Sequence, residues 1–384
     1  MKVLIIGGGA SGMAAALAAA ENENTEVILL ERQARLGKKL SATGNGRCNL
    51  SNLYADIRGY HGEHPEFRNP AMDLYNVENT LNWFHDLGLY TVTEESGKVY
   101  PYSDQANSVV DVLRFALKKP NITVRTGFEA ERVRKSPHGF MVTNQQETLE
   151  ADRLIIACGG LAGTRLGGGM FGYRFLRGFG HHCTRLRPTL VQIKTDWKGI
   201  AALKGVRANC RAQILKDGQV FRESVGEIQF TEMGLSGPVI FEISRDVCEG
   251  KGDWSCCLDL LPDMDLQRLE QELLRRKKTS LPASELFTGI LHNRLGKVVV
   301  KNADITETQP ISVLEDREIK EAAWICKHFT CGLTEPLGMD SAQVTAGGIQ
   351  TEEFDPETME SRLVPGLYAC GEVLDVDGDC GGYN

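Results

Sequence analysis

The stretch "KVLIIGGGASGMAAALAAA", residues 2–20, decides the fold. Its apolar run at residues 3–6 predicts a buried strand that stops at Gly7, and the alanine-rich run after Gly12 has high helix propensity. Gly7, Gly9 and Gly12 form a G-x-G-x-x-G pattern at the turn between the two. Such glycines let the backbone approach a pyrophosphate at the helix N-terminus, so the stretch predicts a dinucleotide-binding unit.

The next strand supports this prediction. "EVILLE", residues 26–31, is apolar between its two glutamates, as expected of a parallel strand buried on both faces. Glu31 follows the glycines by about 20 residues, where a carboxylate accepts hydrogen bonds from ribose hydroxyls. This carboxylate disfavours a ribose 2′-phosphate, although Arg32 beside it leaves that choice open. The alternative is a glycine-rich turn that only packs a helix on a strand.

Two later glycine clusters favour FAD as the dinucleotide. "LIIACGG" at 154–160 and "GLYACGEVLDVDGDCGG" at 366–382 lie far from the first cluster. An extended FAD needs such a late return of the chain, because its adenine and flavin ends lie far apart. The alternative is that Glu372, Asp375 and Asp377 form a metal loop, but their spacing does not match an EF-hand. We therefore predict FAD and no metal site.

The loop "LSATGNGRCNLSN", residues 40–52, has the character of an anion-binding segment. It contains no acidic residue, two glycines flank an asparagine, and an arginine precedes a cysteine. Backbone N–H groups in such loops converge on anionic oxygens. A plain surface turn is the alternative.

The pattern changes after about Pro188, which predicts an inserted part. "GVRANCRAQILKDGQVFRESVGEIQFTE" and "WSCCLDLLP" predict antiparallel strands of a small barrel, and "DLQRLEQELLRRKK" predicts an amphipathic helix. "QVTAGGIQ" and "GLYACGEVLD" then return to short buried strands. We predict an α/β fold with a Rossmann-like FAD-binding domain (1–188 and 335–384), interrupted by a β-barrel-like domain (189–262 and about 319–334) and a helical subdomain (263–318).

The composition favours a small-molecule substrate. The 384 residues include 43 basic and 51 acidic ones, and the formal charge of −8 disfavours nucleic acid or an anionic membrane as the main partner. The density of glycine near the N-terminus argues against a signal peptide, and no other run has membrane-spanning length, so we expect a cytoplasmic protein. The 11 cysteines include no C-x-x-C pair, which predicts reduced and mostly buried thiols.

Several motifs together resemble one family. "GKKLSATGNGRCNLSN", "GEIQFTEMGLSGP", "QVTAGGI" and "GLYACGEVLDVDG" followed by "GGYN" resemble the YhiN-type, BaiN-like FAD/NAD(P)-dependent oxidoreductases, also labelled the aminoacetone oxidase family. The resemblance spans essentially the whole chain. It implies an FAD domain of the glutathione-reductase type with barrel and helical insertions. It also implies NAD(P)H as a transient electron donor and, in one branch, reduction of double bonds in oxo-bile acids.

The resemblance also implies which residues line the FAD. Some hold its ADP part, some the path from pyrophosphate to flavin, and some the flavin ring and ribityl chain. The predicted cofactor-binding residues are Gly7, Gly9, Ala10, Ser11, Gly12, Glu31, Arg32, Lys38, Thr43, Gly44, Asn45, Gly46, Arg47, Cys48, Ala130, Gly159, Gly160, Gly347, Gly348, Gly371, Glu372 and Asp377.

The catalytic residue is not identified by the sequence, and Glu232 and Cys48 are the candidates. The family has Thr-His where this chain has Thr231-Glu232, so Glu232 either replaces a proton donor or marks changed chemistry. Cys48 is either a redox thiol or a packing residue beside the flavin, and the absence of a nearby second cysteine favours packing. The segment "LAGTRLGGGMFGY" also departs from the family, which predicts a different wall of the pocket. Members of the family continue beyond "GGYN" into a terminal helix.

Three functional hypotheses follow. The first is an FAD enzyme that transfers hydride between flavin N5 and a small organic substrate, with NAD(P)H-dependent reduction of an enone-type C=C bond implied by the resemblance. We identify no second G-x-G-x-x-G directly after a predicted strand that would serve NAD(P)H, which argues against a dedicated nicotinamide domain. The second is a flavin oxidase acting on an amine with oxygen, and the third is a non-catalytic flavin-binding protein.

Overall fold

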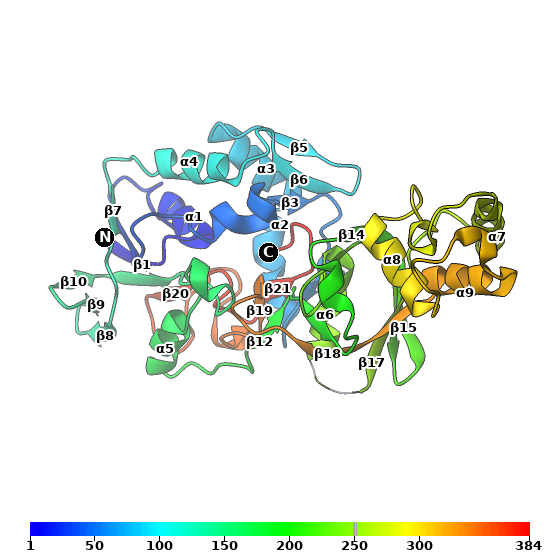
Figure 1. Cartoon of the computed structure of the whole chain (residues 1–384). Coiled ribbons are helices and arrows are strands. Elements are labelled where there is room, and N and C mark those ends of the chain that lie inside the picture. The colour runs from blue at the N-terminus through cyan, green and yellow to red at the C-terminus, as the bar shows by residue number, and fades with distance from the viewer. Residues whose placement is uncertain (249, 251) are drawn as a thin grey trace. The chain divides into compact units, whose positions relative to one another are not determined.

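The computed structural model describes residues 1–248, 250 and 252–384, which form two compact units (Figure 1). The first unit comprises Met1–Thr189 and Met339–Asn384, and the second comprises Leu190–Gly338. The chain therefore leaves the first unit once and returns to it once.

A five-stranded parallel sheet forms the centre of the first unit, in the order β20-β11-β1-β2-β7. Its strands are β1 (Lys2–Ile6), β2 (Glu26–Glu31), β7 (Ile122–Thr126), β11 (Arg153–Ile156) and β20 (Leu367–Ala369). The inner residues of β1 and β2 are buried without interruption, as in a sheet covered on both faces. This sheet confirms the predicted Rossmann-type core.

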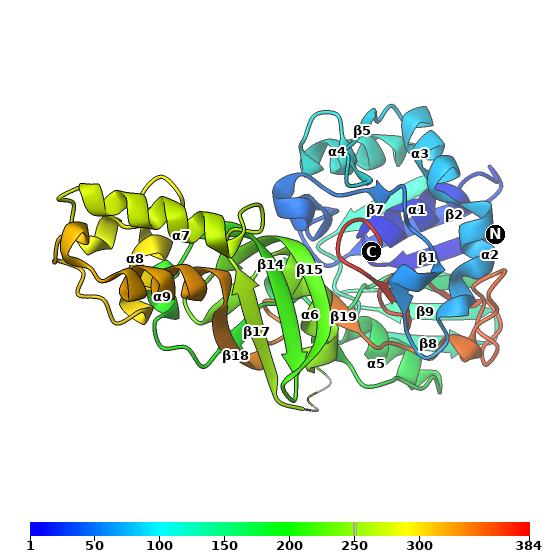
Figure 2. The same ribbon diagram turned by 90° about the vertical axis from the view of Figure 1, so that its right-hand side faces the viewer.

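Alternate residues of β1 contribute to two separate cores, because side chains along a strand point to opposite faces. Val3 and Ile5 pack with α1 (Ala10–Ala19) and α4 (Ala106–Ala116), whereas Leu4 and Ile6 share a core with α5 (Phe171–Gly178). Figures 1 and 2 show α4 on one side of the sheet and α5 on the other.

Shorter elements surround the sheet in the first unit. An antiparallel meander follows β7, and three small sheets join segments that are distant in sequence. These elements are β3 (Ser51–Asn52), β4 (Tyr60–His61), α2 (Asn69–Leu74), α3 (Val77–Asp86), β5 (Thr91–Thr93), β6 (Lys98–Pro101), β8 (Arg132–Ser136), β9 (Gly139–Thr143), β10 (Thr148–Ala151), β12 (Arg187–Thr189), β19 (Val344–Ala346) and β21 (Asp377–Gly378).

The second unit contains a closed barrel in the order β13-β16-β15-β14-β17-β18, which confirms the predicted β-barrel. Its strands are β13 (Ile193–Thr195), β14 (Arg207–Lys216), β15 (Gln219–Phe230), β16 (Gly234–Ser236), β17 (Trp254–Asp259) and β18 (Phe329–Pro336). All the strand pairs of the barrel are antiparallel. The barrel and its helices bury one continuous core.

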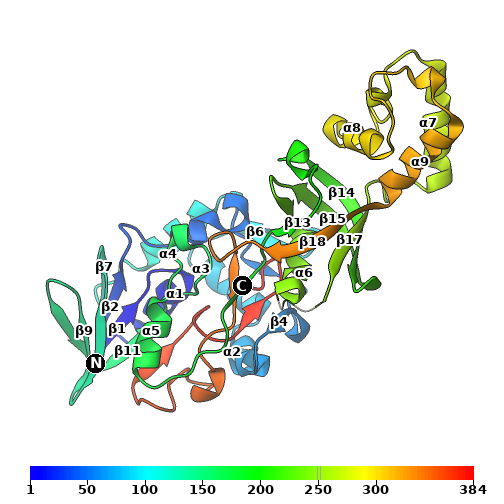
Figure 3. The ribbon, with the colours of Figure 1, turned by 60° about the horizontal axis from the view of Figure 1, so that its bottom comes forward.

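Four helices accompany the barrel. They are α6 (Pro238–Cys248), α7 (Leu266–Arg275), α8 (Asn293–Asn302) and α9 (Asp316–Lys327). The last three lie in the sequence between β17 and β18 and stand together at one end of the barrel (Figure 3). Asp265 caps the first of them by accepting a hydrogen bond from Arg268 N, and Glu315 and Glu318 form a capping box at the last. Among the described residues, no helix combines the length and apolar character needed to cross a membrane.

Candidate functional site

The glycine turn after β1 leaves the start of α1 open. Gly7 has a φ of +116°, and a Cβ there would overlap the carbonyl oxygen of Ala157, so only glycine fits. A Cβ on Gly12 would overlap the carbonyl oxygen of Gly7. At Gly9, in contrast, no atom lies within 4 Å of such a Cβ. The helix therefore presents its N-terminus to free space, which fits the pyrophosphate of a dinucleotide.

Glu31 lies beside this turn with both carboxylate oxygens engaged by backbone. Oε2 accepts a hydrogen bond from Gly8 N at 2.7 Å, and Oε1 accepts one from Gln33 N at 2.7 Å. A carboxylate has about four acceptor positions, so each oxygen keeps capacity for a ribose hydroxyl. The backbone bonds hold the carboxylate in place before any ligand binds.

Arg32 contacts the segment at the start of α5. Its guanidinium donates to Gly167 O at 2.8 Å and stacks 4.4 Å from the ring centroid of Phe171. These contacts tie the end of β2 to the loop before α5. Arg32 stays a predicted cofactor-binding residue, and the choice between a ribose hydroxyl and a 2′-phosphate stays open.

The loop after β2 folds back on itself. It contains a 3₁₀ segment, Leu40–Gly46, in which Gly44 and Asn45 both have a φ of 57°. Arg47 N and Cys48 N then donate to Gly44 O and Thr43 O at 3.2 and 3.0 Å. These turn hydrogen bonds make the loop compact.

Arg47 turns its charge toward acidic partners. Its guanidinium stacks 3.9 Å from the ring centroid of Tyr100, pairs with Glu94 at 2.9 Å and also hydrogen-bonds Asp104. Two carboxylates thus balance one cation in the structure. Arg47 remains a predicted cofactor-binding residue, and its contacts join the loop to the β5–β6 hairpin.

Lys39 and Glu372 join the loop to the C-terminal glycine cluster. Lys39 Nζ lies 2.8 Å from Glu372 Oε2, and Glu372 Oε1 accepts a hydrogen bond from Thr345 N at 2.8 Å. Lys38, which the sequence favoured, instead contacts Gln33 Oε1 at 3.4 Å. Lys39 is not among the residues predicted from the sequence, although it forms a Lys-Lys pair with Lys38 ahead of the loop.

The C-terminal glycine cluster lies against the start of α1. A Cβ on Gly371 would come within 2.5 Å of Ser11 Oγ, so these two predicted residues are neighbours. A Cβ on Gly348 would overlap the backbone of Leu374, and buried Asp377 pairs with His61 between β21 and β4. The structure therefore brings the first and last glycine clusters together.

Three further predicted positions follow β7 and β11 in the chain. Phe128 N donates to Glu31 O at 3.0 Å, so the segment that contains the buried Ala130 starts beside the end of β2. Gly159 has open space around it, whereas Gly160 lies directly against the Glu372 carboxylate.

Asn49 presents an acceptor that has no donor. Its Oδ1 is buried and has no hydrogen-bond partner among the residues that the structure describes, and a Cβ on Gly382 would lie 2.9 Å from it. A buried amide oxygen normally finds a donor, and its desolvation without one is unfavourable. The isoalloxazine ring of FAD has an N–H group, so this orphaned oxygen fits a flavin between the loop and the terminal glycines. Asn49 is not among the residues predicted from the sequence.

Cys48 has the environment of a neutral thiol. Its side chain is buried and its φ is 61°. Burial raises the pKa of the Cys48 thiol, while a hydrogen bond with Thr43 lowers it by less. The thiol therefore keeps its proton at neutral pH, which agrees better with a packing or contact role than with a redox nucleophile.

Glu232 belongs to the second unit, so the structure does not bring the two catalytic candidates together within one unit. Its carboxylate pairs with Lys204 Nζ at 2.6 Å and is 66% exposed. The hydrogen bond from Lys204 holds the pKa of Glu232 below its usual value. The carboxylate is therefore ionised at neutral pH and accepts rather than donates a proton.

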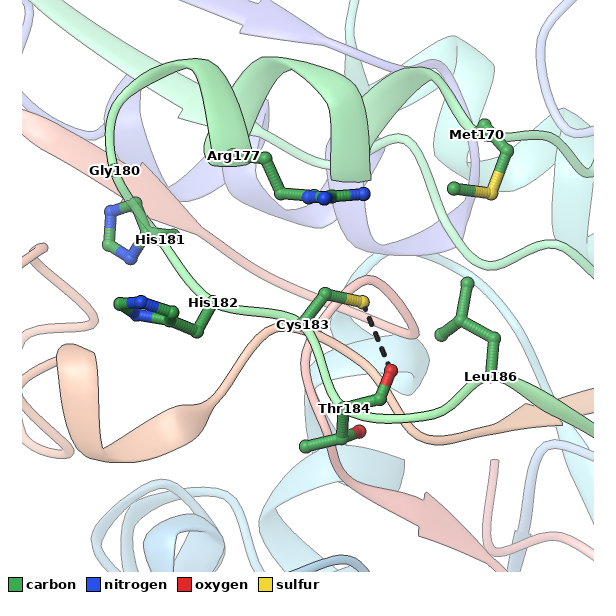
Figure 4. Close-up of a pocket in the computed structure, with 8 residues that line it drawn as sticks. All are labelled: Met170, Arg177, Gly180, His181, His182, Cys183, Thr184 and Leu186. Atoms are coloured by element: carbon green, nitrogen blue, oxygen red, sulfur yellow. Dashed lines mark hydrogen bonds between the residues drawn. The ribbon is translucent and has the colours of Figure 1, made fainter.

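A separate cavity of about 510 Å³ lies at the C-terminal end of α5 (Figure 4). None of the predicted cofactor-binding residues lines it. The residues that do are Met170, Arg177, Gly180, His181, His182, Cys183, Thr184 and Leu186.

His181 beside this cavity has a Ser-His-Glu arrangement. Ser361 Oγ lies 2.9 Å from its Nε2, and Glu353 Oε2 lies 3.0 Å from its Nδ1. Ser361 Oγ also accepts hydrogen bonds from Leu363 N and Val364 N and is buried, so it donates its proton to His181. The hydroxyl has no access to a substrate, and the arrangement ties segments of the first unit together rather than activating a nucleophile. Among residues 1–248, 250 and 252–384, no group of three His, Cys, Asp or Glu side chains has the geometry of a metal site.

Comparison with known proteins gives one family and several relatives. The family described as "HI0933-like protein Rossmann domain" matches residues 1–384. The chain is 38% identical over 390 residues to a 3-dehydro-bile acid delta(4,6)-reductase from Clostridium scindens, covering 100% of this chain and 95% of the relative. It is 31% identical over 387 residues to a ribosomal RNA dihydrouridine synthase from Escherichia coli, covering 99% and 93%. Among solved structures, the quinol fumarate reductase FrdA of Escherichia coli matches with 16% identity and a TM-score of 0.45, covering 100% of this chain and 66% of that chain.

Proposed function

We propose a function from one premise: this chain belongs to the HI0933-like Rossmann-domain family and is an FAD-dependent oxidoreductase. The proposed reaction is the reduction of a carbon–carbon double bond conjugated with a carbonyl group. The proposed substrate is a small apolar acid of the oxo-steroid class, and the proposed electron donor is NAD(P)H.

The proposal rests on a type of reaction that two relatives with different substrates have in common. The name of one describes reduction of double bonds in a 3-oxo steroid acid, and the name of the other describes saturation of a uracil ring in RNA. In both compounds the reduced bond is conjugated with a carbonyl. Because both relatives match almost the entire chain, the reaction type is the property that they have in common.

The site residues fit the cofactor that this reaction requires. The Gly7–Gly12 turn would hold the pyrophosphate, Glu31 the ribose, and the Asn49 amide oxygen an N–H group of the flavin. When bound, FAD supplies the two-electron chemistry, and the protein positions it. The Lys39–Glu372 ion pair would keep the loop and the C-terminal turn at a fixed separation.

Reduction of a conjugated double bond also needs a proton at the carbon next to the carbonyl. Of the two candidates, Cys48 retains its proton at neutral pH, whereas Glu232 beside Lys204 does not. Cys48 is therefore the better proposal for a proton source from this chain, with solvent as the alternative.

The charge of the chain supports a small substrate over RNA. The formal charge is −8, and RNA-binding surfaces need accessible basic side chains. Cations of the helical segment are paired locally: Arg275 with Glu272, Lys277 with Asp316 and Lys297 with Glu285. Such pairing lowers the positive potential that a phosphate backbone would meet.

The test is reoxidation of the FAD-loaded, NADPH- or NADH-reduced protein under anaerobic conditions. We expect a 3-oxo steroid acid with 4,6 double bonds to restore the oxidised flavin spectrum, and an unmodified ribosomal RNA transcript to leave it reduced. Reoxidation by the transcript alone would reverse the substrate assignment. Rapid peroxide formation from oxygen and an amine, with no response to either compound, would favour the oxidase alternative.

A further inference from the structure

Two cysteines that are far apart in sequence meet inside the barrel of the second unit. Cys256 on β17 lies directly opposite Cys331 on β18 in the antiparallel register, and their sulfurs are 3.4 Å apart. Both side chains are buried, and both are free thiols in the structure.

The strand geometry suits a covalent bond between them. Directly opposite residues of antiparallel strands have Cα atoms about 4.5–5.5 Å apart, within the range of about 4.4–6.8 Å found in disulfides. An S–S bond of about 2.05 Å requires the sulfurs to approach by little more than 1 Å, which side-chain rotation can supply. Cys257, the next residue, points to the other face of β17, because burial alternates along that strand.

The two thiols are chemically unequal. The hydrogen bond from Cys256 lowers the pKa of Cys331, while the same contact and burial raise the pKa of Cys256. Cys331 is also the less buried of the two, with 5% exposure against 0%. Cys331 is therefore the sulfur that ionises first and meets an oxidant first.

We propose that Cys256 and Cys331 are a redox-modification site that forms a reversible disulfide with a small peroxide as oxidant. Cys331 attacks one peroxide oxygen, the O–O bond breaks, and a sulfenic acid and one water result. Cys256 then attacks the Cys331 sulfur and displaces the second water. Two thiols and hydrogen peroxide thus give one disulfide and two waters, and a small dithiol reverses the change.

The position of the pair gives the bond a structural effect. β17 leads into α7, α8 and α9, and β18 returns from them, so the disulfide closes the base of this helical segment. Non-covalent contacts already join the end of β17 to the end of α9. Lys327 Nζ pairs with Asp259 at 2.7 Å, and Leu260 N donates to Cys326 O at 3.0 Å. A cross-link across so long a loop restricts the unfolded chain and raises the stability of the folded unit.

The experiment treats the reduced protein with hydrogen peroxide, blocks the remaining thiols, and identifies linked peptides after non-reducing trypsin digestion. We expect peptide 252–268 to be linked to peptide 328–362 with the loss of two hydrogens, and dithiothreitol to restore both. The thermal midpoint of the second unit should rise by about 5–10 °C on oxidation.

Matched variants assign the bond, because peptide 252–268 contains two neighbouring cysteines. Cys257→Ser should keep the link and the thermal shift, whereas Cys256→Ser should lose both while its reduced form still melts cooperatively. Oxidation of Cys331 to sulfinic acid without a link, or a link that survives Cys256→Ser, would overturn the proposal. If the Cys256→Ser variant does not fold, the Cys257→Ser digest decides the question, because Cys256 is then the one cysteine left in peptide 252–268.

Discussion

The side chains of Lys39 and Glu372, 333 residues apart in sequence, meet with 2.8 Å between Nζ and Oε2. The second oxygen of Glu372 accepts the backbone N–H of the buried Thr345. One carboxylate therefore connects the loop after β2, strand β19 and the turn after β20, which are the three segments predicted to surround the flavin.

Glu372→Ala should destabilise the first unit by about 1–3 kcal/mol, because it removes a charged hydrogen bond and leaves the Thr345 N–H without an acceptor. Urea unfolding of the FAD-free protein measures the change. Glu372→Gln, which keeps an oxygen for Thr345 but loses the charge, should cost about half as much. Equal stability of all three proteins would mean that the ion pair does not organise the site.

Glu31→Ala should weaken FAD binding by roughly 10- to 100-fold, the effect of losing a charged acceptor for ribose hydroxyls. Titration of the apoprotein with FAD, followed by quenching of flavin fluorescence, measures the affinity. Glu31→Gln keeps one acceptor oxygen, so its affinity for FAD should lie between those of the wild type and Glu31→Ala. An unchanged affinity in Glu31→Ala would show that the ribose binds elsewhere.

The stability of the first unit should fall as the pH drops through the usual pKa of histidine. Burial lowers the pKa of His181 from its usual value of 6.5, and the neighbouring Glu353 opposes this only in part. The unfolded state then binds a proton at higher pH than the folded state does. The stabilising contribution is therefore complete above about pH 6.5 and is lost as the pH falls below it.

Thermal melts at pH 7.5 and pH 5.5 test this dependence on His181. His181→Gln should have a lower midpoint at pH 7.5 and a smaller difference between the two conditions. His182→Gln is the matched control, because the His182 side chain is 75% exposed. A variant at His181 that keeps the full pH difference would assign the effect to another group.

Cys48 should resist alkylation in the native protein. Its thiol is buried and its pKa is raised by that burial, so little thiolate is available to react at pH 7.5. Brief iodoacetamide treatment followed by mass spectrometry should modify the half-buried Cys257 before Cys48. Preferential labelling of Cys48 would restore the hypothesis of a redox thiol.

Glu232→Ala should change stability by less than about 0.5 kcal/mol, because its ion pair with Lys204 is exposed. We expect kcat for the double-bond reduction to change by less than about threefold, since an ionised carboxylate is not a proton donor. A tenfold loss of kcat with a shifted acidic limb of the pH profile would identify Glu232 as catalytic. Lys204→Met distinguishes loss of the ion pair from loss of the carboxylate, because it removes the lysine and keeps the Glu232 carboxylate.

Local patterns predicted the fold well. The glycine turn, the apolar strands β1 and β2 and the alternating strands of the barrel each depend on a few neighbouring residues, so the sequence contains their signal. The contacts of Lys39, Arg47 and Asn49 depend instead on how distant segments meet. Cys256 and Cys331 show the same limit, because only the register of β17 and β18 makes them neighbours.

The chain leaves the first unit along β12 and comes back along its antiparallel neighbour β19, with Thr189 opposite Val344. The two ends of the inserted segment are thus already side by side, as the two arms of a hairpin are. Replacing everything between them by a two-residue Asn-Gly turn would leave an ordinary β-hairpin and a contiguous first unit. Removal or replacement of the second unit would therefore leave the strand order of the parallel sheet unchanged.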